Sequence, residues 1–279
     1  MLNLRILIVG TGQIGSYLAR RYRDRGHEVI VAGRKSSDSI IEIDLATDQG
    51  VKFDMPHGVN LAIVAAGLTG FSAVARDPER SHAINVTNMQ SLLTRICTQC
   101  PCMYISTSAV FDGSVAYPDE AALPSPQSLY AQQKYCVENF LLDRYEESAI
   151  VVRLTKVIHQ QLELVEHWKV ALIKGRRVNP FSDLVVSPIS REYLSHALLS
   201  IASAGARGVL HLSGQRDLSY ADLCEYFCKL WKCSPELISS IPSHVRADSL
   251  ALCKFAALGM QRSAALGISP CPLDGSAFE

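Results

Sequence analysis

The feature that most constrains the fold is a GxGxxG run at residues 10–15, placed between a short apolar segment and an amphipathic one. The apolar segment at residues 5–9 is uninterrupted and rich in β-branched residues, as expected of a strand buried on both faces. After the glycines, Ile14, Leu18 and Tyr22 repeat with helical spacing. A second apolar run follows, so the glycines occupy the strand-to-helix turn of a βαβ unit, the context that a dinucleotide fingerprint requires.

Each glycine has its own role in that motif. Gly10 allows the tight turn, Gly12 lets a pyrophosphate approach the backbone, and Gly15 lets the helix pack on the strand. The helix N-terminus then faces the phosphates. The predicted cofactor-binding residues of this loop are Gly10, Thr11, Gly12, Gln13, Ile14 and Gly15. The alternative is a glycine turn in a flavodoxin-like fold.

The end of the second strand indicates which dinucleotide is bound. NAD-specific sites usually place an acidic residue there to bind the ribose 2′-hydroxyl. Here Gly33 is followed by Arg34 and Lys35, which are suited to a 2′-phosphate. We therefore predict NADP(H) as the cofactor; the alternative is that two solvated basic residues simply begin a loop.

Further apolar runs alternate with helical patterns. Strands are expected at residues 40–45, 61–67, 103–106 and 149–153, and helices at residues 77–97 and from Ser128 onward. Beyond residue 155, helices are expected at 162–174, 190–204, 220–231 and 247–257, and a strand at 209–212. Further cofactor contacts are expected from Asp44, Leu45, Ala65, Ala66 and Gly67. This alternation predicts an α/β fold, a Rossmann-type doubly wound parallel sheet with a smaller C-terminal substrate-binding lobe. We assign residues 1–155 to an NADP-binding domain, with strands returning near 182–213, and residues 156–279 mainly to the substrate-binding lobe.

Tyr130 and Lys134 are the strongest candidates for catalysis. Four residues apart on a helix, their side chains share one face. A nearby ammonium favours the phenolate and is expected to lower the pKa of the tyrosine from about 10 toward neutrality. Thr107 and Ser108 follow the fifth strand, at the sheet edge where ligands of such folds bind. The alternative for the pair is a surface lysine beside a half-buried tyrosine.

Composition limits the other classes of function. Lys+Arg and Asp+Glu are 27 each, so no basic excess is available for nucleic acid or an anionic membrane surface. No apolar run approaches a membrane span or an export signal, which predicts a cytoplasmic protein with reduced thiols. Cys97, Cys100 and Cys102 lack further ligands at a zinc-site spacing, so no metal is expected.

Taken together, these motifs resemble the extended short-chain dehydrogenase/reductase family, and within it the dTDP-4-dehydrorhamnose reductase group of sugar-nucleotide reductases. The matching segments are residues 41–47, 65–66, 83–86, 105–113, 117, 120, 126, 130–134, 138, 152–154, 187–188, 211–214 and 246–250. The resemblance implies an NADP-dependent oxidoreductase. In it, Tyr130 protonates the substrate, Lys134 binds the nicotinamide ribose and activates Tyr130, and Thr107 orients the carbonyl, with Ser108 as the fallback.

Departures from the group bear on the substrate. Ser108 and Ala109 stand where related dehydratases carry adjacent acids, which argues against dehydration. Lys156 stands where the group often has an aromatic residue; it either binds an anionic part of the substrate or faces solvent. With Arg246, it completes the candidate substrate contacts. We expect a small-molecule keto substrate and leave a homodimer open. An epimerase that retains NAD(P), and a non-catalytic NADP-binding regulatory subunit, are the alternatives.

Overall fold

The computed structural model describes residues 3–34, 40–47, 53–245 and 253–273. The chain divides into two compact units, which we call unit 1 and unit 2. Unit 1 comprises Met1–Phe111, Leu123–Leu154 and Ser195–Leu210, and unit 2 comprises Asp112–Ala122, Thr155–Leu194 and His211–Glu279. The chain thus leaves unit 1 for residues 112–122, leaves it again for residues 155–194, and passes into unit 2 for the last time at residue 211.

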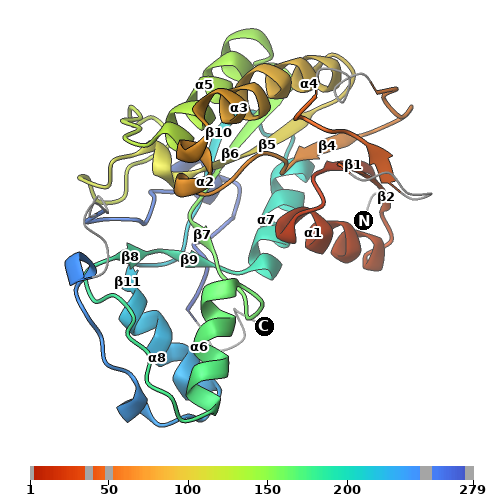
Figure 1. Ribbon diagram of the computed structural model, residues 1–279. Coiled ribbons are helices and arrows are strands. Elements are labelled where there is room, and N and C mark those ends of the chain that lie inside the picture. Colours follow the sequence, from red (N-terminus) through yellow and green to blue (C-terminus); the bar gives the residue numbers. More distant parts are fainter. Residues whose placement is uncertain (1–2, 35–39, 48–52, 246–252, 274–279) are drawn as a thin grey trace. The chain divides into compact units, whose positions relative to one another are not determined.

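A seven-stranded sheet organises unit 1 (Figure 1). Its strands are β1 (Arg5–Val9), β2 (Glu28–Gly33), β3 (Ile40–Glu42), β4 (Leu61–Val64), β5 (Cys102–Thr107), β6 (Ala149–Leu154) and β10 (Gly208–Leu212). They are ordered β3-β2-β1-β4-β5-β6-β10, and every pairing from β3 to β6 is parallel. The predicted doubly wound sheet is confirmed. Its switch point lies between β1 and β4, which places a ligand site beyond the carboxyl ends of these strands.

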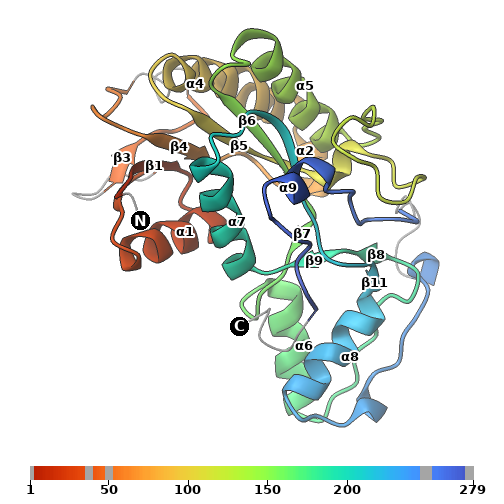
Figure 2. The same ribbon diagram turned by 180° about the vertical axis from the view of Figure 1, so that it is seen from behind.

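Helices cover both faces of this sheet (Figures 1 and 2). Helices α4 (Asn88–Cys97) and α5 (Leu129–Arg144) lie on one face, and α1 (Gln13–Asp24) and α7 (Arg191–Ser203) on the other. The strands read as continuous apolar runs because both of their faces are buried. On the α1 side, the hydroxyl of Tyr22 donates to the Ser195 carbonyl at 3.1 Å, so even this core ring has a partner for its polar end.

Three expectations for unit 1 were wrong in detail. The fourth strand ends at Val64 rather than residue 67. The third strand ends at Glu42 rather than residue 45, although Ile43 and Leu45 beyond it remain buried. Helix α2 (Phe71–Arg76) comes first. In place of the single helix expected at residues 77–97, the structure has three consecutive elements. They are α3 (Pro78–His82), a π-helical turn (Ala83–Thr87) and α4. Asp77 caps α3 by accepting from the Arg80 amide, and Pro78 occupies the first helical position.

Unit 2 is built from shorter pieces. Its elements are β7 (Lys156–Val157), α6 (Glu163–Ile173), β8 (Val185–Val186), β9 (Pro188–Ile189), β11 (Leu218–Ser219), α8 (Tyr220–Leu230), the 3-10 turns Pro235–Leu237 and Ser243–Val245, and α9 (Gln261–Ala265). Helices α6 and α8 pack side by side through a core that includes Trp168, Leu172 and Phe227. The helix predicted at 247–257 was wrong for residues 253–257, which are irregular; the rest of it lies outside the described residues.

Unit 2 relies on specific caps. The Ser219 and Asp222 side chains form a reciprocal capping box at the start of α8. The buried Glu120 carboxylate accepts from the amides of Arg262 at 3.2 Å and Ser263 at 3.4 Å, and so caps α9. Glu120 is also one of the residues that resemble the reductase group, and in this structure its carboxylate serves as a helix cap.

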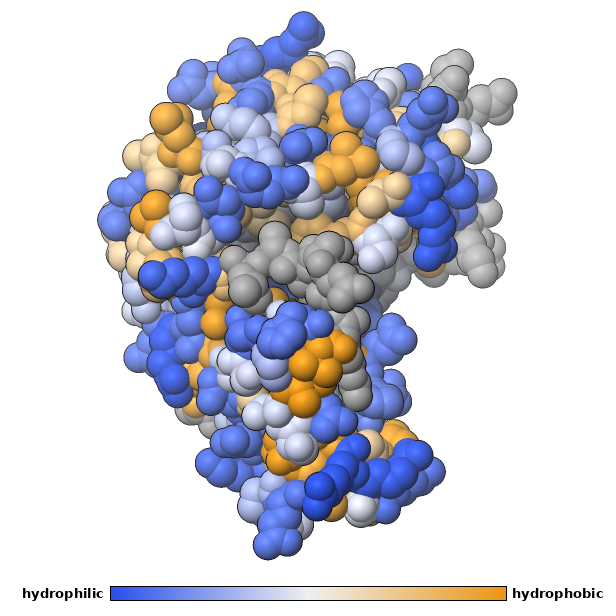
Figure 3. All heavy atoms as spheres, turned by 60° about the vertical axis from the view of Figure 1, so that its left-hand side comes forward, coloured by the Kyte–Doolittle hydropathy of each residue, from blue (hydrophilic) through white to orange (hydrophobic). Residues whose placement is uncertain are grey.

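The surface in Figure 3 is mainly hydrophilic, with single hydrophobic residues among the polar ones. Large exposed hydrophobic side chains include Phe71 and Leu123 in unit 1 and Val115 and Ile173 in unit 2. Over the described part of the chain, no helix combines the length and the apolar character needed to cross a membrane.

Candidate cofactor and active site

The glycine loop after β1 is tightly built at two positions and open at the third. Gly10 has φ +122°, and a Cβ there would lie 2.9 Å from backbone atoms of Ala65 and Ala66. A Cβ on Gly15 would overlap the Gly10 carbonyl oxygen. A Cβ on Gly12 would meet nothing within 4 Å. Gly12 occupies the N-cap position of α1, and no side chain there accepts a hydrogen bond from the first turn. Open space in front of an uncapped helix N-terminus is what a pyrophosphate needs, so these residues fit a dinucleotide.

The end of β2 lies beside this loop. A Cβ on Gly33 would come within 2.6 Å of the Thr11 side chain, so glycine is needed there for close packing. Arg34 follows and is exposed, while Lys35 lies outside the described residues. An exposed guanidinium next to the loop is available to a phosphate group.

The predicted adenine contacts have structural partners of their own. The Asp44 carboxylate accepts from the Ala46 amide at 3.0 Å within a turn. Leu45 is buried in the core, and its carbonyl accepts from the Asn88 side chain at 2.9 Å. Any cofactor contact from Leu45 would therefore come from its backbone.

A buried amide network fixes the chain after β4, and the sequence analysis missed it. Asn85, in the π-helical turn, accepts from the Leu68 amide at 2.7 Å and donates to the Leu68 carbonyl at 3.0 Å. It also donates to Gln133 Oε1 at 2.8 Å, and Gln133 donates to Ser81 Oγ at 2.8 Å. Gly67, at φ +136°, lies against Asn85. We call Ser81, Asn85 and Gln133, with the Leu68 peptide groups, the amide clamp.

Helix α5 positions the two candidate catalytic side chains. The helix expected from Ser128 onward is confirmed, and Ser128 caps it, because its hydroxyl accepts from the Ala131 amide at 3.2 Å. Lys134 is buried; its Nζ donates to the Ile105 carbonyl at 2.9 Å and lies 4.5 Å from the centre of the Tyr104 ring. The ring of Tyr130 is partly buried and makes an edge contact with Phe71, at 5.8 Å between centroids.

The expected lowering of the tyrosine pKa is not what the structure shows. Burial raises the pKa of Tyr130 to about 12. Burial also lowers the pKa of Lys134 to about 8, against an opposing effect of the Glu138 carboxylate. Loss of water is thus the largest cause of both shifts, and residue spacing does not reveal it. A raised pKa keeps Tyr130 protonated at neutral pH, the form needed in a proton donor.

Thr107 ends β5 and caps the following 3-10 turn, Ser108–Val110. Its Oγ1 accepts from the Ala109 amide at 3.1 Å, which leaves the hydroxyl hydrogen available as a donor. Lys134 bonds to Ile105, two residues earlier on β5, so these two groups lie at the same strand end.

The remaining candidates have these locations. Lys156 begins β7 in unit 2 and is solvent-exposed, although surrounding protein atoms lower its pKa by desolvation. Arg246 lies outside the described residues. Cys97, Cys100 and Cys102 are buried in the core, and no group of three potential metal ligands occurs among the described residues.

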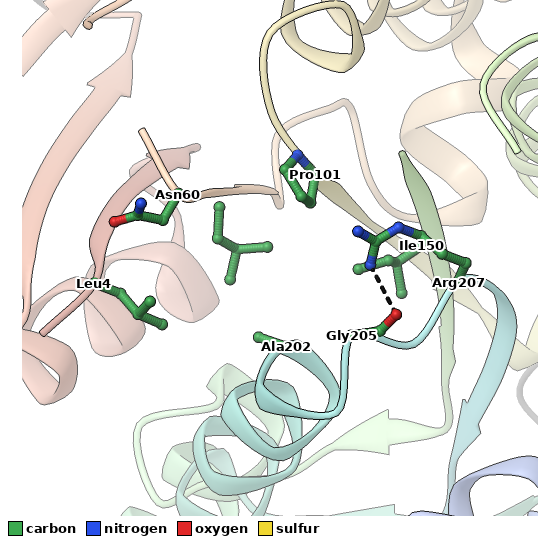
Figure 4. Close-up of a pocket in the computed structure, with 8 residues that line it drawn as sticks. Leu4, Asn60, Pro101, Ile150, Ala202, Gly205 and Arg207 are labelled. Atoms are coloured by element: carbon green, nitrogen blue, oxygen red, sulfur yellow. Dashed lines mark hydrogen bonds between the residues drawn. The ribbon is translucent and has the colours of Figure 1, made fainter. Parts of the chain in front are cut away.

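A cavity of about 90 Å³ lies at the opposite edge of the sheet (Figure 4). Its walls include Leu4, Asn60 and Pro101, which precede β1, β4 and β5, and the Arg207 side chain, which donates to the Gly205 carbonyl. Being at the amino ends of the strands, this cavity is separate from the glycine loop and from Thr107.

Comparison with known proteins gives one family. Residues 4–273 match the family described as RmlD substrate binding domain. A dTDP-4-dehydrorhamnose reductase of Mycobacterium tuberculosis is 27% identical over 280 residues, covering 95% of this chain and 88% of the relative.

Solved structures show the same fold. A Bacillus anthracis dTDP-4-dehydrorhamnose reductase in complex with NADP has a TM-score of 0.85 at 16% identity, covering 97% of this chain and 95% of that one. A UDP-glucose 4-epimerase of Thermotoga maritima, with UDP-glucose, has a TM-score of 0.81 at 20% identity, covering 95% and 93%.

Proposed function

The chain belongs to the RmlD substrate-binding domain family, and on that premise we propose that it is an NADPH-dependent reductase of a keto sugar nucleotide. The relatives named above include reductases of this kind, and one of them was crystallised with NADP. The observation that carries the proposal is the coincidence, in one unit, of the open glycine loop with the Tyr130–Lys134 helix.

The cofactor would be held by residues of unit 1. The pyrophosphate would lie at Gly12 and the α1 N-terminus, and the 2′-phosphate at Arg34. The bound nicotinamide would supply the hydride that reduces the ketone carbon. Lys134 would donate hydrogen bonds to the nicotinamide ribose from its fixed place beside Ile105.

The substrate oxygen would be handled by two hydroxyl groups. Thr107 would donate a hydrogen bond to the ketone oxygen and orient it, because its acceptor side is already engaged by Ala109. Tyr130 would donate its proton to the alkoxide that forms. An alkoxide is far more basic than a phenolate, so a tyrosine whose pKa is about 12 still transfers its proton readily.

The direct test is NADPH oxidation with a panel of keto sugar nucleotides, comparing the wild type with Tyr130→Phe. We expect turnover by the wild type and a loss of about 10²–10⁴-fold in kcat for the variant, with NADPH affinity nearly unchanged. Tyr135→Phe, on the same helix, is the matched control and should retain its rate. Interconversion of sugar epimers without net NADPH consumption would favour the epimerase. NADPH binding without turnover of any substrate would favour a regulatory subunit.

A further inference from the structure

One turn after Lys134, helix α5 carries a fully buried acid, Glu138. Arg153 of β6 donates to one carboxylate oxygen of Glu138 through Nε at 3.0 Å and Nη2 at 2.7 Å. The Ser106 hydroxyl of β5 donates to the other oxygen. The guanidinium of Arg153 also lies over the ring of Phe111, 5.2 Å from its centre.

We propose that Glu138 is a positioning residue: held on both oxygens by Arg153 and Ser106, its carboxylate keeps the buried ammonium of Lys134 charged and directed at the carboxyl end of β5. The catalytic importance of this role rests on the proposed function, whereas the effect of Glu138 on the charge of Lys134 does not. The family resemblance includes Glu138 only as a matching position and assigns it no role.

The Glu138 carboxylate is fixed in place by its donors. It accepts three hydrogen bonds, two of them from the buried guanidinium of Arg153, with which it forms an ion pair. Its partners come from two adjacent strands, β5 and β6, which pair in fixed register with Ser106 opposite Arg153. Such a buried pair is a weak source of stability, so its value lies more in what it fixes.

The groups around Lys134 come from its own helix and from the elements packed on it. On α5, the titratable groups that face it are Tyr130 and Glu138, and β5 contributes the Tyr104 ring. From β6, Arg153 reaches this region through Glu138. The other elements packed on α5 add only exposed cations, Arg76 of α2 and Arg95 of α4, apart from the buried thiols of Cys97 and Cys102. Glu138 therefore carries the only carboxylate in this set, and beside it the face of the Tyr104 ring also attracts the ammonium.

The consequence for pH dependence follows from the direction of each effect. Burial lowers the pKa of Lys134 to about 8, and Glu138 works against that lowering. Lys134 therefore loses its proton as pH rises through about 8, and any property that needs the ammonium declines there. Removing the negative charge of Glu138 lowers the pKa of Lys134 further, so the decline moves to lower pH. Tyr130, with a pKa of about 12, cannot account for a limb in this range.

The test measures two properties of the full-length protein between pH 6.5 and 9.5. These are kcat/KM for NADPH-dependent reduction and the Kd for NADPH from cofactor fluorescence. For Glu138→Gln we expect the basic limb of both profiles to move down by about one pH unit or more, so that the Kd at pH 8 rises severalfold relative to the wild type. Asp143→Asn is the matched control, because it makes the same chemical change at an exposed position of the same helix. Its profiles should follow those of the wild type.

The double variant Glu138→Gln with Arg153→Met keeps the proposal open to refutation if the single variant fails to fold. With both charges removed, the pH of its basic limb should lie between the values for the wild type and Glu138→Gln. If Glu138→Gln does not fold, the limb of the double variant should still lie at a lower pH than that of the wild type. If neither folds, Ser106→Ala must move the limb in the same direction by a smaller amount. A uniform drop in kcat, with the limb unmoved, would make Glu138 merely structural and overturn the proposal. Because the Kd profile needs no turnover, failure of the reductase assignment is distinguishable from failure of this one.

Discussion

Unit 1 and unit 2 are stabilised in different ways. Unit 1 has six strands that pair in parallel and a core whose residues recur with regular spacing. Unit 2 has two two-stranded sheets of two-residue strands, and much of its order comes from helix packing and caps such as Ser219 and Glu120. A regular sheet gives a strong local signal in the sequence, whereas loops and caps depend on single residues. The tests below ask whether cofactor binding depends on unit 1 alone.

The largest effect is expected in the glycine loop of unit 1. Gly15→Ala places a methyl group into the Gly10 carbonyl, so it should destabilise unit 1 by about 1–3 kcal/mol or more and abolish NADPH binding. Gly12→Ala meets open space at a φ that alanine adopts, so unfolding should be little changed while NADPH binding weakens. Thermal unfolding and NADPH titration of both variants separate the two cases. Equal melting temperatures for both variants would show that Gly15 does not pack as described.

A smaller effect is expected at the end of β2. Arg34→Ala removes the exposed cation assigned to the 2′-phosphate, so the Kd for NADPH should rise about 10–100-fold, while the Kd for NADH changes little. Arg144→Ala, an exposed arginine in the last turn of α5, is the control and should affect neither. Equal weakening of both cofactors would remove the 2′-phosphate assignment.

The smallest effect is expected in unit 2. Ser219→Ala removes the hydroxyl half of the capping box at α8 and should lower the free energy of unfolding by about 1 kcal/mol, measured in urea. Ser219→Thr should preserve most of that stability. The Kd for NADPH should be unchanged in both variants, and a large change would mean that cofactor binding extends to unit 2.

Much of unit 1 could be predicted from the sequence. Its strands, the α1 and α5 helices and the Ser128 cap each leave a short-range pattern of apolar spacing or capping residues. The amide clamp does not, because Asn85 and Gln133 are 48 residues apart and nothing near either one signals the other. A local pattern did exist for Glu138, four residues after Lys134, but its partner Arg153 was visible only as a residue of a buried strand.

The pKa of Tyr130 illustrates a second limit. Spacing predicts which side chains share a helix face, and that prediction placed Tyr130 and Lys134 on α5 correctly. Whether attraction or loss of water dominates depends on burial by distant segments, including Phe71, which contacts the tyrosine ring. The helix predicted over residues 247–257 was wrong at 253–257 for a related reason. Contacts with distant residues override the helical spacing there, such as the hydrogen bond from the Ala257 amide to the Asp217 carboxylate at 2.7 Å.

The amide clamp also has a consequence for how the molecule acquires its order. Its polar groups come from segments around residues 68, 81, 85 and 133, and the buried amides of Asn85 and Gln133 find their partners only in the other segments. Because these bonds join residues 17, 48 and 52 positions apart in the chain, the clamp is complete only when all of these segments have come together. Replacing Gln133 would therefore leave the two bonds between Asn85 and Leu68 in place but remove one acceptor of the Asn85 amide group.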